Sequence, residues 1–553
     1  MKKQALAILA ASRIKHDFMT IFNTVPAMLP FNGKPLAYQT ILQFIRDNSG
    51  PVIVALPKGE DYIGNFLKTV FAERAEIKVC YIEDAKPHCQ MSTLKQIMQK
   101  MLDEQVEDMP LLVANGDIYF ETFKDRCSEK YVAWVDNGYK NSKYSHFLKT
   151  ESKIQYIDIN EELTPSDQAN TVIDCGIYSI PSWKKFLNNA QTTETNMTVG
   201  KYLATTYSLT EFCCKAIKNW VDLGNLDSAT KISTKLLGAR EFNDIKIDER
   251  RGLIYKSSSK KQNKILQEIN YYIKLPKELK IYFPRLYDFA IGKKVWYSIE
   301  YYPYKTLSEY FVMYELSNEY WARVFDRIFE IMGDFNRFQC QKPQIDEYRS
   351  AYIGKLEERM NALTRCDEIY TLTEQPSVKI NGKSYFGWKH YLSYIKNCVD
   401  NQFARLNAVA IHGDLCFSNI LYDPKTNLVR LIDPRGEFFG EGIYGDPFYD
   451  IAKLMHSVHG GYDFIIQQMY LLKEVDRYEF EFNLIQSVAS KNIKNILLNR
   501  LNKRYTPLEI RTVLIYEALL FLTMLPLHSD DVKRQKALYL TSLIVFDQAD
   551  KFY

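Results

Sequence analysis

The residues with the clearest chemical potential lie between Ile411 and Asp450, in the C-terminal part of the chain. A loop that begins H-G-D contains Asp414 and then Asn419, and an apolar run typical of a strand ends at Asp433. Transfer of a phosphoryl group needs a carboxylate that accepts a hydroxyl proton and oxygen ligands that hold Mg²⁺ on the phosphates. These three side chains could supply one base and two metal ligands. A plain turn with helix-capping aspartates is the simpler alternative, but it has no need of Asn419 and Asp433.

The H-G-D-L-x-x-x-N loop, the I-D that ends the next strand and the later G-D-P-x-x-D resemble the catalytic core of the aminoglycoside phosphotransferase and choline kinase family. Members of that family are small-molecule kinases with the protein-kinase fold. The resemblance implies that Asp414 is the catalytic base, that Asn419 and Asp433 are Mg²⁺ ligands, and that Asp450 braces the catalytic loop. It also implies ATP as the phosphate donor.

Upstream residues could complete the small lobe of such a kinase. Lys256 lies in the strand-like L-I-Y-K-S, and a following helix carries Glu268. In kinases a strand lysine contacts the α- and β-phosphates and a helix glutamate holds it in place. A lone strand lysine would more simply be a solvated edge residue, but the downstream segment favours the phosphate role. The stretch Val295–Tyr302 is predicted to be the hinge strand, whose backbone around Glu300 and Tyr302 would contact the adenine.

The N-terminal part alternates short apolar runs with helical ones, which predicts an α/β, Rossmann-like domain with a mostly parallel sheet. The predicted strands are Ala5–Ala10, Val52–Leu56, Ile77–Ile82, Leu111–Ala114, Tyr131–Val135 and Thr171–Tyr178, and the predicted helices are Leu36–Asp47, Gly64–Arg74 and Met91–Gln105. Ligands in such sheets bind beyond the carboxyl ends of the strands, so the residues that follow each strand are the candidates for function.

Five short motifs follow one another in this part: L-A-A-S-R, N-G-K-P-L, a strand that ends N-G-D, C-G-I-Y and W-V-D-L-G. Each alone is a weak signal, but in this order they resemble the sugar-phosphate nucleotidyltransferase family. Its members join a nucleoside triphosphate to a phosphorylated sugar or alcohol and release pyrophosphate. The resemblance implies that Asp117 and Asp222 hold Mg²⁺, and oxygen ligands suit a hard cation that neutralises the leaving pyrophosphate. Asn115, in the same N-G-D turn, is a further candidate contact to the nucleotide.

The first motif departs from the pattern of that family, whose loop is usually L-A-A-G-x-G-x-R. Ser12 stands in place of the first glycine, no other glycine occurs before Gly33, and the usual Pro-Lys before the second motif is absent. Either Arg13, Lys15 and Lys34 contact the triphosphate in an altered loop, or the domain keeps the fold without turnover. The two remaining aspartates favour an active domain, in which Arg13 and Lys15 would stabilise the pyrophosphate.

Length and composition limit the remaining possibilities. A chain of 553 residues exceeds one hydrophobic core, and we predict a nucleotidyltransferase-like domain over residues 1–228 and a kinase-like domain over 229–553, with a small lobe over 229–304 and a large lobe over 305–553. The 71 basic and 67 acidic residues are too balanced to indicate nucleic acid as a partner. Ten scattered cysteines show no zinc or redox spacing and favour a reduced, cytoplasmic setting. The apolar run Val513–Leu525 is too short for a membrane span.

Helical periodicity dominates the predicted large lobe. The expected helices are Trp321–Phe338, Ile345–Arg365, Tyr385–Leu406, Tyr449–Val458, Asp463–Leu472, Glu479–Ser490 and Pro507–Met524. Three aromatic residues close to the catalytic segment, Tyr444, Phe448 and Tyr449, could form a cage for a quaternary ammonium. The sequence does not decide between that role and ordinary packing.

The two parts together predict a bifunctional enzyme. A kinase would phosphorylate a small alcohol or sugar with ATP, and a nucleotidyltransferase would then attach a nucleotide from CTP or another NTP, giving an NDP-activated precursor for capsule or another surface glycan. The alternatives are a kinase with a non-catalytic nucleotide-binding domain, or a pseudo-enzyme scaffold of glycan assembly. The acceptor, which could be choline, ethanolamine, a polyol or a sugar, and the NTP stay open, and a homo-oligomer is possible.

Overall fold

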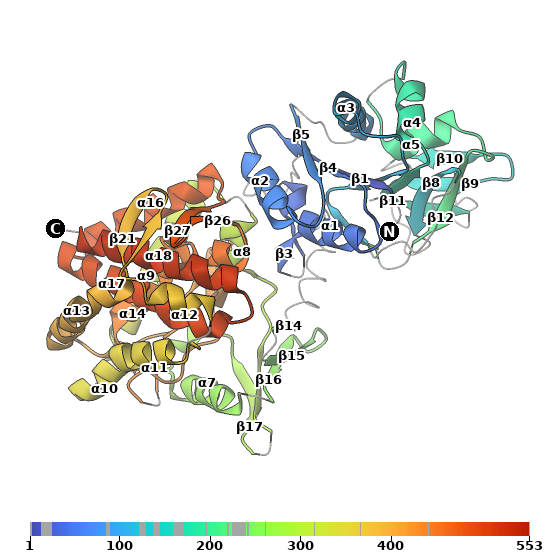
Figure 1. The fold of residues 1–553 in the computed structure, drawn as a ribbon. Coiled ribbons are helices and arrows are strands. Elements are labelled where there is room, and N and C mark those ends of the chain that lie inside the picture. Colours follow the sequence, from blue (N-terminus) through green and yellow to red (C-terminus); the bar gives the residue numbers. More distant parts are fainter. Residues whose placement is uncertain are drawn as a thin grey trace. The chain divides into compact units, whose positions relative to one another are not determined.

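The computed structural model divides the chain into two compact units, Met1–Ser233 and Thr234–Tyr553 (Figure 1). The residues described are 3–12, 25–31, 33–83, 89–120, 129–136, 144–158, 170–193, 196–217, 220–223, 239–240, 243–259, 261–292, 294–314, 316–364, 367–440 and 442–551. The predicted boundary between residues 228 and 229 lies outside these ranges and stays a prediction.

The core of the first unit is a sheet with the order β10-β9-β11-β6-β1-β4-β5, in which β8 also pairs with β11 and with β12. These strands are β1 (Ala5–Leu9), β4 (Val52–Pro57), β5 (Ile77–Ile82), β6 (Leu111–Asn115), β8 (Tyr131–Asp136), β9 (His146–Lys149), β10 (Ile154–Ile157), β11 (Thr171–Ile180) and β12 (Phe212–Ala216). All six predicted strands are present.

The prediction of a mostly parallel sheet is wrong, because the sheet is mixed. β6, β1, β4 and β5 are parallel, as are β8 and β12. β11 runs antiparallel to β6, β8 and β9, and β9 runs antiparallel to β10. The strands β9, β10 and β12 were not predicted, since short strands at a sheet edge carry only a brief apolar pattern.

Helices cover both faces of this sheet, which explains why its central strands are apolar along their whole length. They are α1 (Leu36–Asp47), α2 (Asp61–Val70), α3 (Gln90–Asp103), α4 (Trp183–Ala190) and α5 (Val199–Thr206). α3, α4 and α5 form one core with one face of the strands, and α1 and α2 lie on the other side (Figure 1). A small antiparallel ribbon joins β7 (Ile118–Phe120), which follows β6 closely in the sequence, to β13 (Trp220–Asp222). Of the candidate metal ligands, Asp222 ends β13 and Asp117 lies in the turn before β7.

The second unit begins with an antiparallel sheet and one helix, as predicted for a small lobe. The sheet has the order β14-β15-β16-β18-β17, and α7 (Gln262–Lys274) follows β16. The strands are β14 (Ala239–Arg240), β15 (Asn243–Asp248), β16 (Leu253–Ser257), β17 (Leu286–Ala290) and β18 (Trp296–Glu300). The hairpin turn between β15 and β16 lies where the charged residues Asp248 to Arg251 predict it.

Helices make up most of the large lobe. They are α8 (Leu307–Val312), α9 (Asn318–Phe335), α10 (Ile345–Arg349), α11 (Lys355–Asn361), α12 (Glu368–Thr373), α13 (Leu392–Arg405), α14 (Pro447–Val458), α15 (Tyr462–Ile466), α16 (Val488–Arg504), α17 (Pro507–Met524) and α18 (Val532–Asp550). The catalytic segment lies among short strands, β22 (Val409–Ala410), β23 (Ile420–Asp423), β24 (Leu428–Leu431) and β25 (Tyr444–Gly445).

Three helix predictions in this lobe are wrong in part. The first residues of Tyr385–Leu406, the end of Asp463–Leu472 and the start of Glu479–Ser490 are strands of a four-stranded sheet with the order β21-β20-β27-β26. These strands are β20 (Ser377–Ile380), β21 (Lys383–Phe386), β26 (Tyr470–Asp476) and β27 (Glu479–Leu484). The segment E-F-E-F-N-L alternates with the period of two that belongs to a strand, so the sequence contained the signal.

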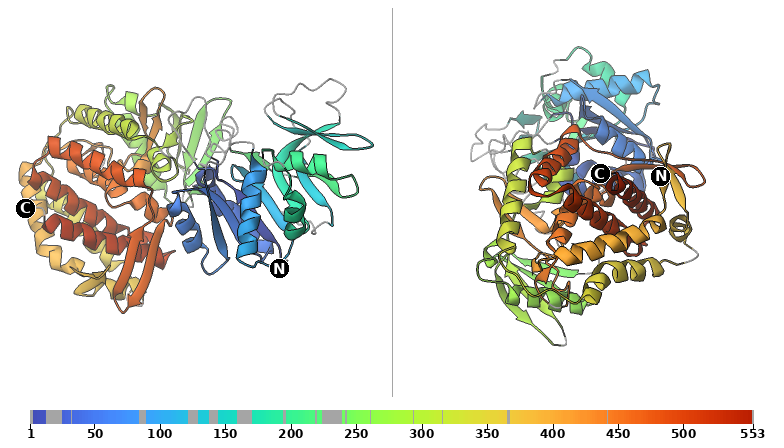
Figure 2. Two further views of the ribbon diagram at one scale, coloured as in Figure 1. Left: turned by 90° about the horizontal axis from the view of Figure 1, so that it is seen from above. Right: turned by 90° about the vertical axis from the view of Figure 1, so that its left-hand side faces the viewer.

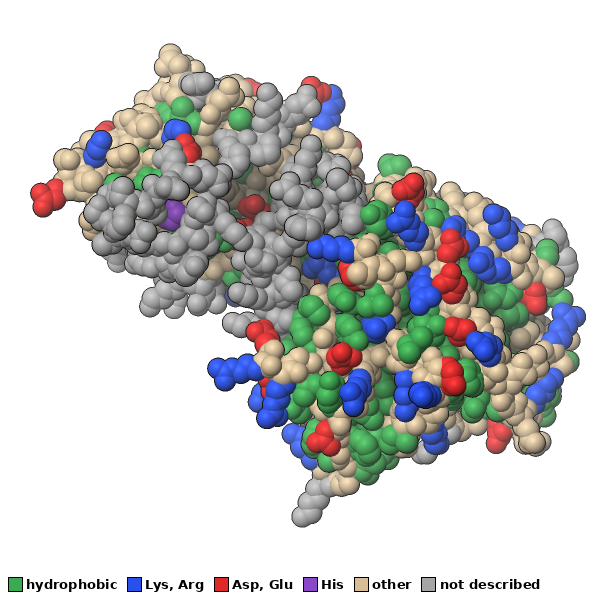
Figure 3. Space-filling view, turned by 180° about the vertical axis from the view of Figure 1, so that it is seen from behind, with side chains coloured by type: hydrophobic (Ala, Val, Ile, Leu, Met, Phe, Trp, Pro, Cys, Tyr) green, Lys and Arg blue, Asp and Glu red, His purple; other side chains and the backbone are tan. Residues whose placement is uncertain are grey.

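The apolar helix near the C-terminus packs inside the second unit. Of the described helices, only Pro507–His528 is long and apolar enough to cross a membrane, and 78% of its apolar window is buried, as in a core helix. α17 lies beside α18 and α14 (Figure 2). Its Thr506 and Glu509 form a capping box that fixes the N-terminus. Basic and acidic side chains are interspersed on the face of the second unit in Figure 3.

Candidate active sites

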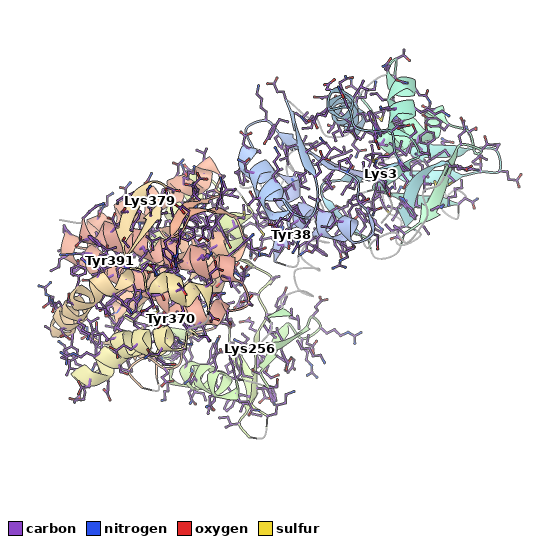
Figure 4. All side chains as sticks on the ribbon, in the orientation of Figure 1. Lys3, Tyr38, Lys256, Tyr370, Lys379 and Tyr391 are labelled. Carbon is purple, nitrogen blue, oxygen red and sulfur yellow. The ribbon has the colours of Figure 1, made fainter. Side chains whose placement is uncertain are left out.

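The buried lysine of the small lobe is the centre of the first site. Lys256 on β16, labelled in Figure 4, donates hydrogen bonds of 2.8 Å to Glu268 on α7 and 2.8 Å to Asp433 of the large lobe. Tyr297 on β18 donates a third hydrogen bond, of 2.6 Å, to Glu268. Both members of the Lys256–Glu268 pair are almost completely buried. Residues distant in the sequence thus form one charged network between the two lobes.

This network predicts that the free energy of unfolding of the second unit depends strongly on the pairing of Lys256 with Glu268. Removing one partner of a buried ion pair leaves an uncompensated charge, at a cost of about 3 kcal/mol. We expect Lys256→Met to destabilise the second unit by about that amount, and the Lys256→Met, Glu268→Gln double variant to recover part of the loss. Urea unfolding of the wild type, Lys256→Met, Glu268→Gln and the double variant completes a double-mutant cycle, which measures the coupling free energy between Lys256 and Glu268. Additive effects of the two substitutions would show that the pair is not coupled.

The predicted catalytic loop is held in place by a buried carboxylate. Asp450 on α14 accepts the backbone N–H groups of His412 and Gly413, at 2.7 and 2.8 Å. Burial lowers the pKa of His412 to about 4, so its ring is neutral. Its Nδ1 lies 3.3 Å from the Asp414 N–H and its Nε2 lies 3.0 Å from the Ile432 carbonyl, which fits one acceptor and one donor on the same imidazole.

The side chain of Asp414 is oriented by two contacts. Asn419 donates 2.9 Å hydrogen bonds to its carboxylate and to its backbone carbonyl, and the Lys453 ammonium lies 2.8 Å from its Oδ1. Burial acts to raise the pKa of Asp414, but Lys453 outweighs that effect and the net shift is downward. The carboxylate is therefore ionised at neutral pH, which is the form that accepts a proton or a hydroxyl hydrogen bond.

Asp433 follows β24 with φ +56°, a left-handed conformation that costs free energy for a residue other than glycine. Such strain is typical of functional positions, and here it accompanies the contact with Lys256. Asp433, Asn419 and Asp414 line one cavity of about 440 Å³, together with Lys355, Arg435, Tyr449 and Lys453. The structure therefore brings the three residues predicted from the catalytic segment into one cleft.

The two predicted hinge residues lie at the end of β18. The Tyr302 hydroxyl donates to the Glu300 carboxylate at 2.7 Å, and the Arg430 guanidinium lies 5.0 Å from the Tyr302 ring centre. The backbone N–H of Glu300 donates to Arg285, so it is occupied within the sheet. No backbone carbonyl of the described residues accepts the Tyr302 N–H, and its contact with adenine stays a prediction.

The second site lies in the first unit, at the end of β6. The N-G-D turn fits closely against the end of β1: the Gly116 N–H donates to the Leu9 carbonyl at 2.9 Å, and a Cβ on Gly116 would lie 2.5 Å from the Cβ of Ala10. Only glycine fits there, so the turn delivers Asp117 in a fixed position. The register of β7 with β13 pairs Ile118 with Asp222, which places the two predicted metal ligands beside each other.

The proximity of these carboxylates has an electrostatic consequence. Burial, and then the charge of Asp222, raises the pKa of Asp117 to about 7. Two partly buried carboxylates that repel each other are a donor set that a divalent cation would neutralise, so the pair fits Mg²⁺. Among the described residues no group of three or more His, Cys, Asp and Glu side chains is arranged to hold a metal.

A raised carboxyl pKa means that the folded state holds the proton more tightly than the unfolded state. The associated stability is present at low pH and is lost as the pH rises from about 4 to about 7. We therefore expect Asp222→Asn to increase hydrogen-exchange protection of β6 roughly tenfold at pH 8 in metal-free protein, with little effect at pH 5. Mg²⁺ should increase protection in the wild type but not in the variant. Equal protection of the two metal-free proteins at pH 8 would contradict the repulsion.

The cavity around this pair has a volume of about 270 Å³ and includes Ser12, Asn115, Asp117 and Asp222 in its lining. The buried Asn115 side-chain oxygen has no hydrogen-bond partner in the part of the chain that the structure describes. Such an atom in a cavity wall is suited to a ligand that donates a hydrogen bond. A third carboxylate, Asp174 on β11, also lines the cavity, and burial raises its pKa to about 6.

Lys34, another predicted contact to the triphosphate, is not among the described residues that line this cavity. Its ammonium lies 5.9 Å from the ring centre of Tyr38. Arg13 and Lys15 lie outside the described residues, so their roles stay predictions. The structure thus brings the predicted acidic residues together at this cavity, and the role of Lys34 stays a prediction.

Sequence reasoning missed Lys355, Arg435, Lys453 and Asp174. Only Lys453 had a local signal, because it follows Asp450 by three positions on the same helix and so lies on the same face. The other three are placed by tertiary packing.

No protein-family model matches the sequence, and no curated protein matches it. Solved structures resemble it in part. A nucleoside-diphosphate-sugar pyrophosphorylase from Vibrio cholerae RC9 shares 14% identity and a TM-score of 0.33 over 41% of this chain and 98% of its own. An inositol-1-phosphate CTP transferase from T. maritima has 12% sequence identity and a TM-score of 0.33, over 42% of this chain and 96% of its own. A thermostable mutant of an aminoglycoside phosphotransferase has 10% sequence identity and a TM-score of 0.38, over 57% of this chain and 94% of its own. These likenesses are low, so the function proposed below depends on the geometry of the sites.

Proposed function

We propose that the chain is a bifunctional enzyme that phosphorylates a small hydroxyl compound with ATP and then joins the new phosphate to a nucleotide. The observation that carries the proposal is the network in which Lys256 bridges Glu268 and Asp433, in the cleft that also presents Asp414. This combination of a held lysine and an oriented carboxylate suits the transfer of a γ-phosphoryl group, where positioning and charge neutralisation supply most of the catalysis.

In the second unit, Asp414 would accept the hydroxyl proton as the acceptor oxygen bonds to the γ-phosphorus and ADP leaves. Asn419 holds Asp414 in place and, with Asp433, would also hold Mg²⁺. Lys256 would contact the phosphates of ATP. When bound, Mg²⁺ supplies positive charge that neutralises the phosphate oxygens during transfer.

In the first unit, Asp117 and Asp222 would hold the cation at the nucleotide. The phosphate made by the second unit would attack the α-phosphorus of CTP or another NTP, and pyrophosphate would leave. Asn115 would hydrogen-bond the nucleotide or sugar, and Arg13 and Lys15 would stabilise the pyrophosphate. The product would be an NDP-linked precursor for capsule or another surface glycan. Linking both activities in one chain raises the local concentration of the intermediate.

The proposal is tested by incubating the full chain with ATP, a set of alcohols and sugars, and CTP, UTP, GTP or dTTP. Mass spectrometry of the products and a pyrophosphate assay follow the two reactions separately. We expect a phosphorylated acceptor first and a nucleotide-linked product with one NTP. Phosphorylation without pyrophosphate release for any NTP would instead support a kinase with a non-catalytic first unit.

A further inference from the structure

Three cations surround one tyrosine in the cleft of the second unit. The Arg435 Nη1 donates to the Tyr449 hydroxyl at 3.2 Å, and the Lys355 Nζ donates to it at 3.4 Å. Lys453, Lys355 and Arg435 each lie 5.9 Å from the Tyr449 ring centre. They come from α14, α11 and the segment after Asp433, so the fold gathers positive charge here from separate elements. We call Lys355, Arg435, Lys453 and Tyr449 the basic cluster.

The basic cluster is not neutralised by its surroundings. Lys453 is paired with Asp414, but within the described part of the chain neither Lys355 nor Arg435 has a carboxylate within ion-pair distance. The side chains of both residues are partly buried. Partly buried cations without partners are costly, and they are typically retained to bind an anion.

The pKa of Tyr449 reflects the positive electrostatic potential that these three cations create. Burial would raise the pKa of its hydroxyl, yet Lys355, Lys453 and Arg435 together lower that pKa to about 8. The same field would repel a cationic ligand. Three cations already lie near the ring of Tyr449, so this ring is poorly suited to a quaternary ammonium.

We propose that the acceptor phosphorylated in this cleft is an oxyanion, a hydroxyl compound that already carries a carboxylate or phosphate group held by Lys355 and Arg435. The proposal rests on the proposed kinase function and defines its substrate class. Lys453 bridges the basic cluster to Asp414, so an anion bound by Lys355 and Arg435 would present its hydroxyl near the catalytic carboxylate. A guanidinium and an ammonium suit this task because both form charge-assisted hydrogen bonds with oxyanions.

The test uses the full chain saturated with Mg²⁺ and a non-hydrolysable ATP analogue, whose own binding is measured first. Inorganic phosphate and acetate then serve as probes for the two kinds of oxyanion, and choline serves as the cationic probe, each titrated by calorimetry. We expect at least one oxyanion to bind, with roughly tenfold weaker affinity in Lys355→Met and in Arg435→Gln, and no binding of choline. Lys396→Met, which changes an exposed lysine on α13, is the matched control and should retain the affinity of the wild type.

The methionine of Lys355→Met preserves the packing of the lysine's aliphatic stem. A further variant, Tyr449→Phe, removes the hydroxyl of Tyr449 and keeps its ring. Ionised Tyr449 would add a negative charge among Lys355, Arg435, Lys453 and Asp414. Acetate affinity should therefore fall as the pH rises through about 8 in the wild type and stay constant in Tyr449→Phe.

Binding of choline, absence of binding by both oxyanions, or equal oxyanion affinity in the wild type and both cation variants would overturn the proposal. Failure to bind the ATP analogue would instead remove the kinase function. In that case the oxyanion titrations are repeated without the analogue, and they still measure how much Lys355 and Arg435 contribute to oxyanion affinity.

Discussion

Replacement of Asp414 by Asn should reduce ATP-dependent phosphorylation by about 10²–10⁴-fold, the range expected for loss of a general base. The amide has almost the same shape, so the 2.9 Å contact with Asn419 gives no reason for the loop to collapse. The amide cannot accept a proton at neutral pH, and it removes the negative charge that faces Lys453 at 2.8 Å. The loss should appear mainly in kcat, since Lys256, held by Glu268, would still contact the nucleotide phosphates.

The measurement is the initial rate of ADP formation that depends on the acceptor, with the affinity for the ATP analogue determined in parallel. Retained analogue binding shows that the variant is folded. Pyrophosphate release from an NTP in the presence of a chemically phosphorylated acceptor should be unaffected, because we assign that reaction to the first unit. A rate within tenfold of the wild type would remove Asp414 from the mechanism.

The double variant Asp117→Ala, Asp222→Ala should lose pyrophosphate release almost completely while phosphorylation continues. The charge of Asp222 helps to raise the pKa of Asp117. Asp117 directly precedes β7, whose Ile118 pairs with Asp222 on β13, so the two carboxylates form a single acidic pair. Removing both carboxylates removes the oxygen ligands that would hold the cation, but it also removes their mutual repulsion, so the fold should be retained.

Pyrophosphate release with a phosphorylated acceptor and the preferred NTP measures this effect. Asp174→Asn is a useful comparison, because Asp174 lines the same cavity but is held by Gly176 and Tyr178. Persistent pyrophosphate release in the double variant would place the metal elsewhere. Loss of phosphorylation as well would show that the two units do not act independently.

Much of the site in the second unit could be predicted from sequence because its residues lie in short motifs. Lys256 and Glu268 belong to a strand and a helix with clear periodicity, and their pairing follows once both elements are placed. Asp414, Asn419 and Asp433 lie within one segment, where spacing alone limits their arrangement.

Lys355 and Arg435 could not be predicted in the same way. Each is an ordinary charged residue in its local context, and only the packing of α11 beside the cleft and the turn after Asp433 bring them together. The mixed sheet of the first unit escaped prediction for a similar reason. The direction of β11 is set by its pairing with β6 and β8, which no local pattern encodes.

The strands β26 and β27 are a different case. Glu479–Leu484 alternates with a period of two and forms a strand, whereas the helical periodicity of the large lobe predicts a helix there. Here the local pattern was correct and the interpretation was wrong.

The most direct test of two consecutive reactions is to follow the γ-phosphate of ATP. The full chain is supplied with ATP labelled in that phosphate, an unlabelled NTP and the acceptor found by the screen, and the products are separated. We predict that the label appears in the phosphate that joins the acceptor to the nucleotide, with unlabelled pyrophosphate released. Label that stays in a simple phosphate ester, with no nucleotide-linked product for any NTP, would contradict the bifunctional assignment.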